Sequence, residues 1–402
     1  MTGSRHLAEP AVLGGPAGLR AAIAASGGPA IALVDRVVSE TAAGREALCY
    51  IRSQPQFAAV RVVEGSPQAR DLVEIAAARP GIRLVVGIGG GCVIDQVKLL
   101  AGLYRRDDTT RYLSVSQRAG WTSLRADAER EVTLVVVPTT LGTGAEMSRV
   151  ACLESAAGKR LIEGAVLRAD AAVYDARMTA TLPGALVMEG IFEAWSRLLG
   201  ALGGAAASVA SEDALATGAA TRLTELGFEA RDELLAGGAP GEELRHEVAR
   251  LSAMSHSHWL HLSRPPFAYK AWFLATELAG HAGTRKVPAM AAVLPPVWEE
   301  ILSGGGVLGD RRALLRAWRA IRAVASADLP ADPVDGLRRL LASWGVAASA
   351  GDVNPEAVAR GAIRRWGAGL PMLGGTDLEL LKRVFEGCLE TATNARTEAY
   401  DL

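Results

Sequence analysis

The sequence predicts an α/β N-terminal domain built around a parallel sheet, followed by an all-α C-terminal domain. Up to about residue 180, short β-rich runs alternate with helical stretches, which is typical of strand–helix–strand units in a parallel sheet. After Pro183 the strand signals nearly vanish, and long stretches rich in Ala, Leu, Arg and Glu follow. We therefore place the two domains at residues 1–180 and 181–402.

Each predicted element rests on a local pattern. Strands are expected at Ala30–Val34, Val60–Val63, Arg83–Ile88 and Leu134–Val137, of which the last two are apolar without alternation, as in strands buried on both faces. Helices are expected between them at Gln68–Ala78 and Val93–Tyr104. In the C-terminal domain the expected helices, separated by Gly- and Pro-rich breaks, are Ala185–Leu202, Ser211–Ala236, Glu242–Leu262, Leu314–Ala325 and Leu378–Thr393.

The composition argues against several classes of protein. Half of the 402 residues are apolar and the formal net charge is −1, so no basic surface for nucleic acid is expected. The N-terminus lacks the apolar core of a signal peptide, and the longest apolar runs are only strand-length, so no membrane insertion is expected. The 4 cysteines are scattered and form no CxxC pair, which favours a cytoplasmic protein over a disulfide framework.

A glycine-rich turn is the strongest local signal. Gly87–Asp95 (GIGGGCVID) lies where a buried strand passes into a helix, and Lys98 follows on that helix. Glycines let backbone N–H groups approach a phosphate closely, and the helix N-terminus adds a partial positive charge. The turn is therefore a candidate pyrophosphate site, although the same glycines also suit a tight turn without a ligand.

A second polar segment, Pro138–Ser148 (PTTLGTGAEMS), follows another buried strand. Ligands of open α/β sheets bind at the carboxyl ends of the strands, where this segment begins. Taken alone, it is equally compatible with a surface loop.

Together the two segments resemble the iron-containing alcohol dehydrogenase superfamily, a relative of dehydroquinate synthase. The shared pattern is GGG-x-x-x-D-x-x-K followed by PTT-x-GTG-x-E, and Leu167–Asp175, Thr181–Pro183 and Gly190 are similar to the family's crossing into its helical domain. The resemblance implies a dehydroquinate synthase-like fold, an NAD(P)-dependent alcohol oxidoreductase and a homo-oligomer.

The resemblance also implies which residues bind the cofactor, which is NAD with NADP as the alternative. Those residues are Gly89, Gly90, Gly91, Asp95, Thr139, Thr140 and Thr143. The glycines would hold the pyrophosphate, and the threonines would line the nicotinamide side. Asp35 takes a position where relatives often carry an Asp against the adenosine ribose, and a carboxylate there favours NAD because it repels a 2′-phosphate.

The positions of the family's metal ligands are altered. Relatives carry G-x-x-D-A-x-x-x-H on the first helix of the second domain, whereas here Glu193 stands at the Asp position and Arg197 at the His position. Counting back from Leu294, Lys286 takes the position of a later histidine, and Trp272 or Lys270 takes that of an earlier one. A guanidinium cannot be deprotonated to bind a metal, so we expect no metal.

Other histidines offer an alternative metal site. His256, His258 and His261 form an HxHxxH cluster that, with His281 and Glu193, supplies ligand types that zinc or iron accepts. The other interpretation is that these histidines are satisfied by hydrogen bonds on a helix, where HxH spacing separates the two rings.

A mechanism without a metal follows from these substitutions. Arg197 and Lys286 would place positive charge beside the nicotinamide, where it can hold a substrate carboxylate or stabilise an alkoxide. Lys270 or His281 would be the general base, and Glu193, at the family's Asp position, is a further candidate catalytic residue. Such a site suits a small-molecule hydroxy acid, or a peptide substrate as in the dehydrogenase of daptide-type ribosomal peptide clusters, thought to oxidise and decarboxylate a C-terminal Thr.

Three alternatives remain open from the sequence. The first is an ordinary metal-dependent alcohol dehydrogenase or aldehyde reductase with displaced ligands. The second is a sugar-phosphate cyclase of the dehydroquinate synthase type, which the GTG-x-E loop disfavours. The third is a non-catalytic nucleotide-binding protein that serves a partner.

Overall fold

The chain folds into two compact units. The computed structural model describes residues 9–104, 109–115, 117–125, 130–155, 158–204, 209–265 and 267–398. The first unit comprises the chain up to Pro183 together with Arg245–His256, and the second comprises Gly184–Leu244 and Ser257–Leu402. The predicted boundary lies close to the first crossing, but the sequence did not reveal that Arg245–His256 returns to the first unit.

A 6-stranded parallel sheet forms the centre of the first unit, in the order β1-β9-β6-β4-β2-β3. Its strands are β1 (Ala11–Gly14), β2 (Ala30–Asp35), β3 (Phe57–Val63), β4 (Leu84–Gly89), β6 (Thr133–Pro138) and β9 (Ala171–Tyr174). The predicted fold class is therefore confirmed, and each of the four predicted strands exists in the sheet.

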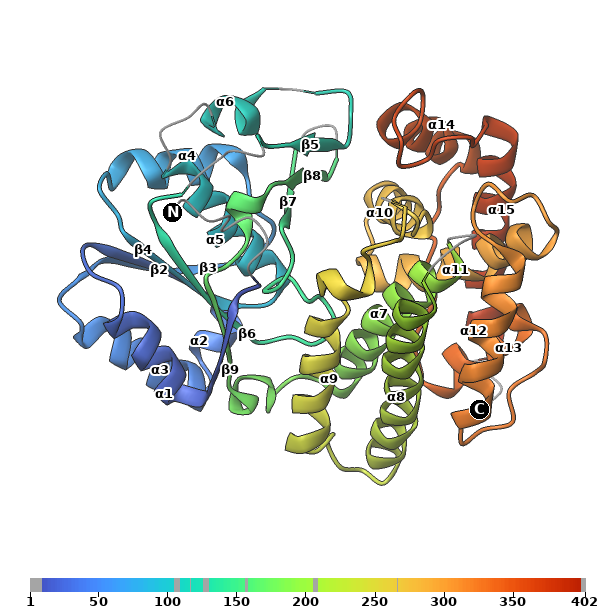
Figure 1. The fold of residues 1–402 in the computed structure, drawn as a ribbon, viewed down its shortest axis with the longest axis horizontal. Helices are drawn as coiled ribbons and strands as arrows, with labels where there is room; N and C mark the ends of the chain where they lie inside the picture. The colour runs from blue at the N-terminus through green and yellow to red at the C-terminus, as the bar shows by residue number, and fades with distance from the viewer. Residues whose placement is uncertain are drawn as a thin grey trace. The chain divides into compact units, whose positions relative to one another are not determined.

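Helices cover both faces of this sheet (Figure 1). On one face lie α1 (Gly15–Ala24) and α3 (Ala42–Ser53), which bury side chains against alternate strand residues such as Ala32 and Val34. On the other face lie α4 (Ala69–Ala78) and α5 (Gly91–Leu103), packed against Ile31 and Leu33. The strands are apolar without alternation because both of their faces are buried in this way.

Short elements complete the first unit. They are α2 (Arg36–Ser39), α6 (Thr109–Ser114), the 3-10 turns η2 (Ala165–Leu167) and η3 (Ala176–Thr179), and a small sheet of β5 (Trp121–Ser123), β8 (Arg160–Glu163) and β7 (Val150–Leu153). The small sheet was not predicted, because its strands have only 3 or 4 residues, too short for a recognisable alternation.

The strand order places a topological switch between β2 and β4. Strand β3 pairs with one side of β2, whereas the next strand, β4, pairs with the other side. The connections from β2 and β4 therefore leave in opposite directions, and ligands of open α/β sheets bind in the crevice this creates. Asp35 and Gly89 end the two strands at that point.

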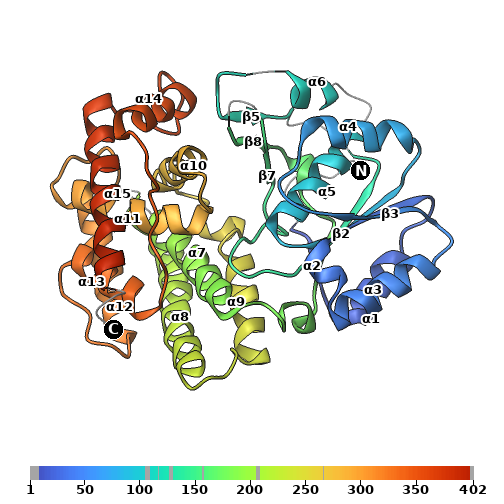
Figure 2. The ribbon, with the colours of Figure 1, turned by 180° about the vertical axis from the view of Figure 1, so that it is seen from behind.

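The described residues of the second unit form helices and no strand. The helices are α7 (Gly184–Gly203), α8 (Ala210–Leu235), η4 (His258–Leu260), α10 (Ala271–Ala282), α11 (Lys286–Leu302), α12 (Arg311–Val324), α13 (Pro333–Ser343), α14 (Pro355–Trp366) and α15 (Leu378–Glu398) (Figure 2). Nowhere in the described ranges is a helix long and apolar enough to cross a membrane.

An aromatic cluster fixes α7 within the second unit. The fully buried ring of Trp195 lies 6.0 Å from Trp344 and 6.3 Å from Trp298 between ring centroids, and its Nε1 donates to Thr224 Oγ1 on α8 at 3.0 Å. The indole thereby has both apolar neighbours and a hydrogen-bond acceptor. This packing sets the orientation of α7, which carries Glu193 and Arg197.

One predicted helix is too long. The sequence predicted a helix over Glu242–Leu262, whereas α9 spans Glu242–Met254 and is followed by a turn and η4. The Ser255 hydroxyl donates to the Ser252 carbonyl at 2.6 Å, an alternative to helical pairing that serine often supplies. The histidines after Met254 therefore do not share one helix.

Candidate active site

The glycine turn and the threonine-rich loop lie against each other in the first unit. Gly90 precedes α5 as its N-cap, and Gly91 is the first residue of that helix. A Cβ atom at Gly90 would lie 2.9 Å from Thr140 Cγ2, and one at Gly91 would lie 3.2 Å from Thr143 Cγ2. A side chain at either position would push the threonine opposite it, so glycine lets the loop and the turn approach closely. The two segments singled out in the sequence therefore form one site.

The threonine loop leaves a buried hydroxyl without a partner. The Thr139 N–H donates to the Gly89 carbonyl at 3.1 Å, which joins the ends of β6 and β4. Among the described residues, Thr140 Oγ1 is buried and has no hydrogen-bond partner. Buried polar atoms are almost always paired, so this hydroxyl is suited to a ligand. The turn and this loop fit a dinucleotide.

Asp35 lies at the switch point, as the resemblance implies for a ribose-binding carboxylate. Its Oδ1 accepts a hydrogen bond from the Val38 N–H at 3.2 Å and so caps the short helix α2. The position fits the prediction, and the contact with a ribose stays a prediction.

Asp95 has a structural partner that the sequence did not reveal. Its Oδ2 accepts from the Cys152 N–H at 3.0 Å, and Lys98 Nζ donates to the Val150 carbonyl at 3.1 Å. Both contacts fasten α5 to β7. Asp95 therefore helps to pack the glycine-bearing helix against β7, and its role in cofactor binding stays a prediction.

The side chains that the resemblance places at the metal-ligand positions form one cluster in the second unit. Lys286, the first residue of α11, donates to Glu193 Oε1 on α7 at 2.7 Å, and the nearest Arg197 nitrogen lies 3.6 Å from the same oxygen. Burial alone would raise the pKa of Glu193, but the charges of Lys286 and Arg197 outweigh it and hold that pKa below its usual value. The carboxylate is therefore ionised between two cations.

Trp272 completes this cluster. Lys286 Nζ lies 4.8 Å from the centroid of the Trp272 ring, a cation–π distance. Lys270 instead donates to the Met372 carbonyl at 3.4 Å, and burial lowers the pKa of its ammonium. Of the two residues that the sequence left open for the earlier ligand position, Trp272 is the one in contact with Lys286.

His281 has partners of its own. Its Nε2 lies 3.3 Å from Glu277 Oε1, and the buried Glu277 also accepts from Trp366 Nε1 at 2.9 Å. A Cβ atom at Gly361 on α14 would lie 3.0 Å from His281 Nε2. These contacts place His281 in the packing of α10 against α14, and its predicted role as a base stays a prediction.

Sequence reasoning missed Tyr269. Its ring lies over Gly200 of α7, where a Cβ atom would overlap it, and its hydroxyl donates to Met290 Sδ at 3.0 Å. Burial raises the pKa of Tyr269, so its phenol is neutral. Its position beside Gly200 is a result of tertiary packing, and the spacing of residues on α7 does not predict it.

The histidine cluster does not form the alternative metal site on one helix. His256 Nε2 lies 3.0 Å from the Thr143 carbonyl in the first unit, whereas His258 begins η4 of the second. In the part of the chain that the structure describes, no group of three or more His, Cys, Asp and Glu side chains is arranged to hold a metal ion.

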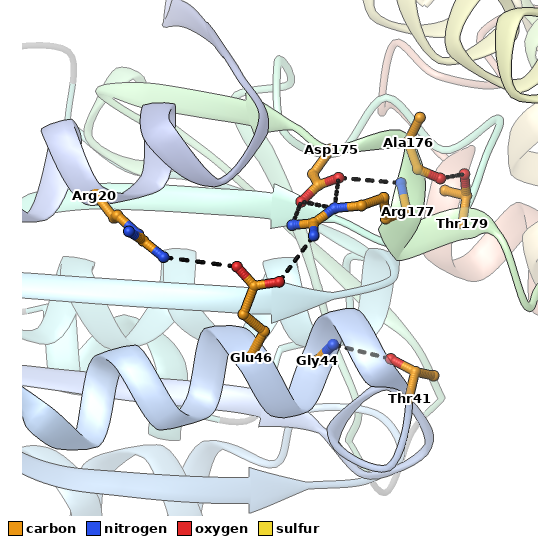
Figure 3. A network of polar contacts seen from close by, with 8 residues as sticks. All are labelled: Arg20, Thr41, Gly44, Glu46, Asp175, Ala176, Arg177 and Thr179. Atoms are coloured by element: carbon orange, nitrogen blue, oxygen red, sulfur yellow. Dashed lines mark hydrogen bonds and ion pairs between the residues drawn. The ribbon is translucent and has the colours of Figure 1, made fainter.

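A charged network holds the chain where it leaves the sheet (Figure 3). Asp175 caps η3 and pairs with Arg177 at 2.7 Å, and Arg177 also donates to Glu46 of α3 at 2.8 Å. Arg20 of α1 lies 3.7 Å from the same Glu46 carboxylate. The network ties η3, which leads towards α7, to both helices on that face.

Known proteins share both the local pattern and the fold. Residues 17–176 match the model of the iron-containing alcohol dehydrogenase family. The match covers the sheet, the glycine turn and the threonine loop, and ends before the helical unit.

Two curated proteins are similar to this chain over part of its length. The chain is 33% identical over 110 residues to long-chain-alcohol dehydrogenase 1 of Geobacillus thermodenitrificans, covering 27% of each protein. It is 35% identical over 101 residues to the probable alcohol dehydrogenase EutG of Salmonella typhimurium, covering 25% of this chain and 24% of the relative. The chain thus matches about a quarter of these relatives' length.

Solved structures show the same fold over nearly the whole chain. NADH-dependent butanol dehydrogenase A of Thermotoga maritima superposes with a TM-score of 0.76 at 14% identity, covering 94% of this chain and 96% of its own. YqhD of E. coli K-12 gives 0.78 at 17% identity, covering 95% and 98%. Both units therefore share the fold of these solved structures.

The side chains that the resemblance assigns to the metal-ligand positions do not fit a divalent cation. Of Glu193, Arg197, Trp272 and Lys286, only the carboxylate is a ligand of the usual kind. The guanidinium and the indole cannot ligate, and Lys286 is paired as an ammonium with that carboxylate.

Proposed function

We propose that this protein is a nicotinamide-dependent oxidoreductase that acts on an alcohol and uses Lys286 and Arg197 where its relatives use a metal. The observation that carries the proposal is the 2.7 Å contact between Lys286 Nζ and Glu193 Oε1, with Arg197 at 3.6 Å. These residues come from helices far apart in the sequence and meet at the positions that the resemblance assigns to the metal ligands.

The cofactor would be held by the glycine turn and the threonine loop. The N–H groups at the start of α5 favour a pyrophosphate, and the unpartnered Thr140 hydroxyl offers a hydrogen bond to the nicotinamide side. A bound nicotinamide would supply the hydride acceptor. Asp35 favours NAD over NADP through charge repulsion of a 2′-phosphate.

The cluster in the second unit has the charge that the chemistry requires. Two cations and one carboxylate leave one net positive charge, held in a partly buried setting. Fixed positive charge stabilises an alkoxide as its proton leaves. Glu193 keeps both cations in place, and the Trp272 ring supports the ammonium.

Lys270 is our proposed base for the hydroxyl proton. Burial lowers the pKa of its ammonium, which raises the fraction of neutral amine near physiological pH. Its neighbour Tyr269 lies beside α7, which carries the cationic cluster.

The same charge favours a substrate with a carboxylate, and we propose a hydroxy acid. If the hydroxyl is β to the carboxylate, loss of hydride and proton gives a β-keto acid. Its carbon–carbon bond to the carboxylate can then break, releasing carbon dioxide and passing the electron pair to the ketone without a metal. A peptide ending in Thr is the substrate of this kind that we propose, in a cytoplasmic setting.

The test replaces Lys286. With NAD and a peptide ending in Thr, we expect the wild type to form NADH and a decarboxylated peptide, observed by mass spectrometry. Lys286→Met should lower kcat by about 100-fold, as expected for loss of a group that stabilises the transition state, and Lys286→Arg should retain more activity.

The matched control is Lys382→Met, which removes a more exposed ammonium on α15. It should leave kcat unchanged, and all three variants should bind NAD as the wild type does. Full activity in Lys286→Met would refute the role of the ammonium, and an unchanged peptide with bound NAD would refute the substrate.

A further inference from the structure

The segment Arg245–His256 is fastened to the first unit at both of its ends. Arg245 donates from Nε to Thr179 Oγ1 at 3.2 Å, which joins it to η3 beside the network of Figure 3. At the other end, His256 Nε2 lies 3.0 Å from the Thr143 carbonyl. The segment therefore spans from the exit of the sheet to the threonine loop.

The His256 contact determines which nitrogen carries the proton. A carbonyl oxygen only accepts hydrogen bonds, so Nε2 must be the donor. The donated hydrogen bond fixes the orientation of the peptide between Thr143 and Gly144.

Gly144 shows how closely the imidazole approaches the loop. Its φ is +56°, and a Cβ atom there would overlap the His256 ring and lie 2.9 Å from the Ser252 carbonyl. The loop thus has a left-handed glycine where the ring lies, so the two are matched in shape as well as in hydrogen bonding.

The same loop residue lies close to the glycine turn. Thr143 Cγ2 lies 3.2 Å from where a Cβ atom at Gly91 would be. Thr143 therefore lies next to the first residue of α5 and also accepts the hydrogen bond of His256, so the imidazole acts on the loop at the residue nearest to the turn.

A small pocket lies between the segment and the loop. Residues of the first unit line it, including Thr140, Glu146, Arg245 and Ser252. Ser252 is 1% exposed, and among the described residues its hydroxyl, like that of Thr140, has no hydrogen-bond partner. The segment and Thr140 thus line the same pocket.

We propose that His256 is a positioning residue for the nicotinamide half of the cofactor, acting through the Thr143 carbonyl. This inference rests on the proposed function, because it assumes that the threonine loop binds the nicotinamide side. His256 holds the loop at the distance from the glycine turn that lets Thr140 reach its ligand. It makes no contribution to the adenosine half, which lies at the β2–β4 switch.

The experiment compares two ligands by calorimetry. His256→Ala should raise the Kd for NAD by about tenfold, the effect of one lost hydrogen bond, and should leave the Kd for AMP unchanged. His256→Gln should restore most of the NAD affinity, because its amide N–H can reach the same carbonyl. The exposed His258→Ala is the matched control and should bind both ligands as the wild type does.

The possible results distinguish failure of the proposed function from failure of the role of His256. Wild-type protein that binds neither ligand would overturn the proposed function and this inference with it. Wild-type binding of NAD with unchanged affinity in His256→Ala, or with an equal loss for AMP, would overturn the role of His256 alone. If His256→Ala does not fold, the glutamine variant decides: NAD affinity matching the wild type supports the inference, and weakening of both ligands contradicts it.

Discussion

Single residues in this protein show how burial and charge act together. Lys98 is 0% exposed, and burial lowers its pKa from 10.5 to about 8, although Asp95 and Glu146 act in the opposite direction. A buried ammonium is tolerated here because it donates to the Val150 carbonyl and has carboxylates nearby. Keeping this ammonium charged in a buried position lowers the free energy of unfolding of the first unit.

The lowered pKa of Lys98 makes the free energy of unfolding depend on pH. Between pH 8 and 10.5 the unfolded chain binds more protons at Lys98 than the native protein does, so the free energy of unfolding rises with pH. The contribution is about 3 kcal/mol over that range. Lys98→Met should remove this rise.

Denaturant titrations at several pH values measure the effect. The wild-type curve is compared with that of Lys98→Met, and Lys382→Met is the control for a lysine that is only half-buried. A difference that stays constant from pH 8 to 10.5 would contradict the assignment.

At the scale of elements, close helix contacts depend on glycine. On α13, a Cβ atom at Gly336 would overlap the ring of Trp318 on α12. On α8, a Cβ atom at Gly218 would meet nothing within 4 Å. The two glycines look alike in the sequence, but only the first is required by packing.

Alanine substitutions should separate these two positions. Gly336→Ala should destabilise the protein by about 1–3 kcal/mol, because an added methyl forces Trp318 out of place. Gly218→Ala should stabilise it by up to about 1 kcal/mol through helix propensity. Chemical denaturation measures both, and a neutral or stabilising Gly336→Ala would show that the helices can move apart without cost.

Some element boundaries could be read from the sequence and others could not. Strand β4 and helix α7 were predicted closely, because continuous apolar runs and Ala-rich stretches are local signals. The end of α9 was missed, because it is decided by serine hydrogen bonds and by the contact of His256 with a distant loop. The small sheet was missed for lack of length.

At the scale of the whole molecule, the expected chemistry does not depend on a metal. Protein dialysed against a strong chelator should keep its NAD-dependent activity, because we propose that an ammonium and a guanidinium act where relatives use a metal. Elemental analysis of the dialysed protein gives the remaining metal content. Loss of activity on chelation, with recovery only after iron or zinc is added, would contradict this prediction.

The sequence by itself determined the α/β and helical parts, the glycine turn and the threonine loop, because a run of neighbouring residues specifies each of them. Only the tertiary structure decided which of these residues meet. Lys286 and Glu193 are 93 residues apart and His256 and Thr143 are 113 apart, so no local pattern pairs them. Their contacts arise from the packing of helices and loops around buried side chains, which forms only when the whole chain folds.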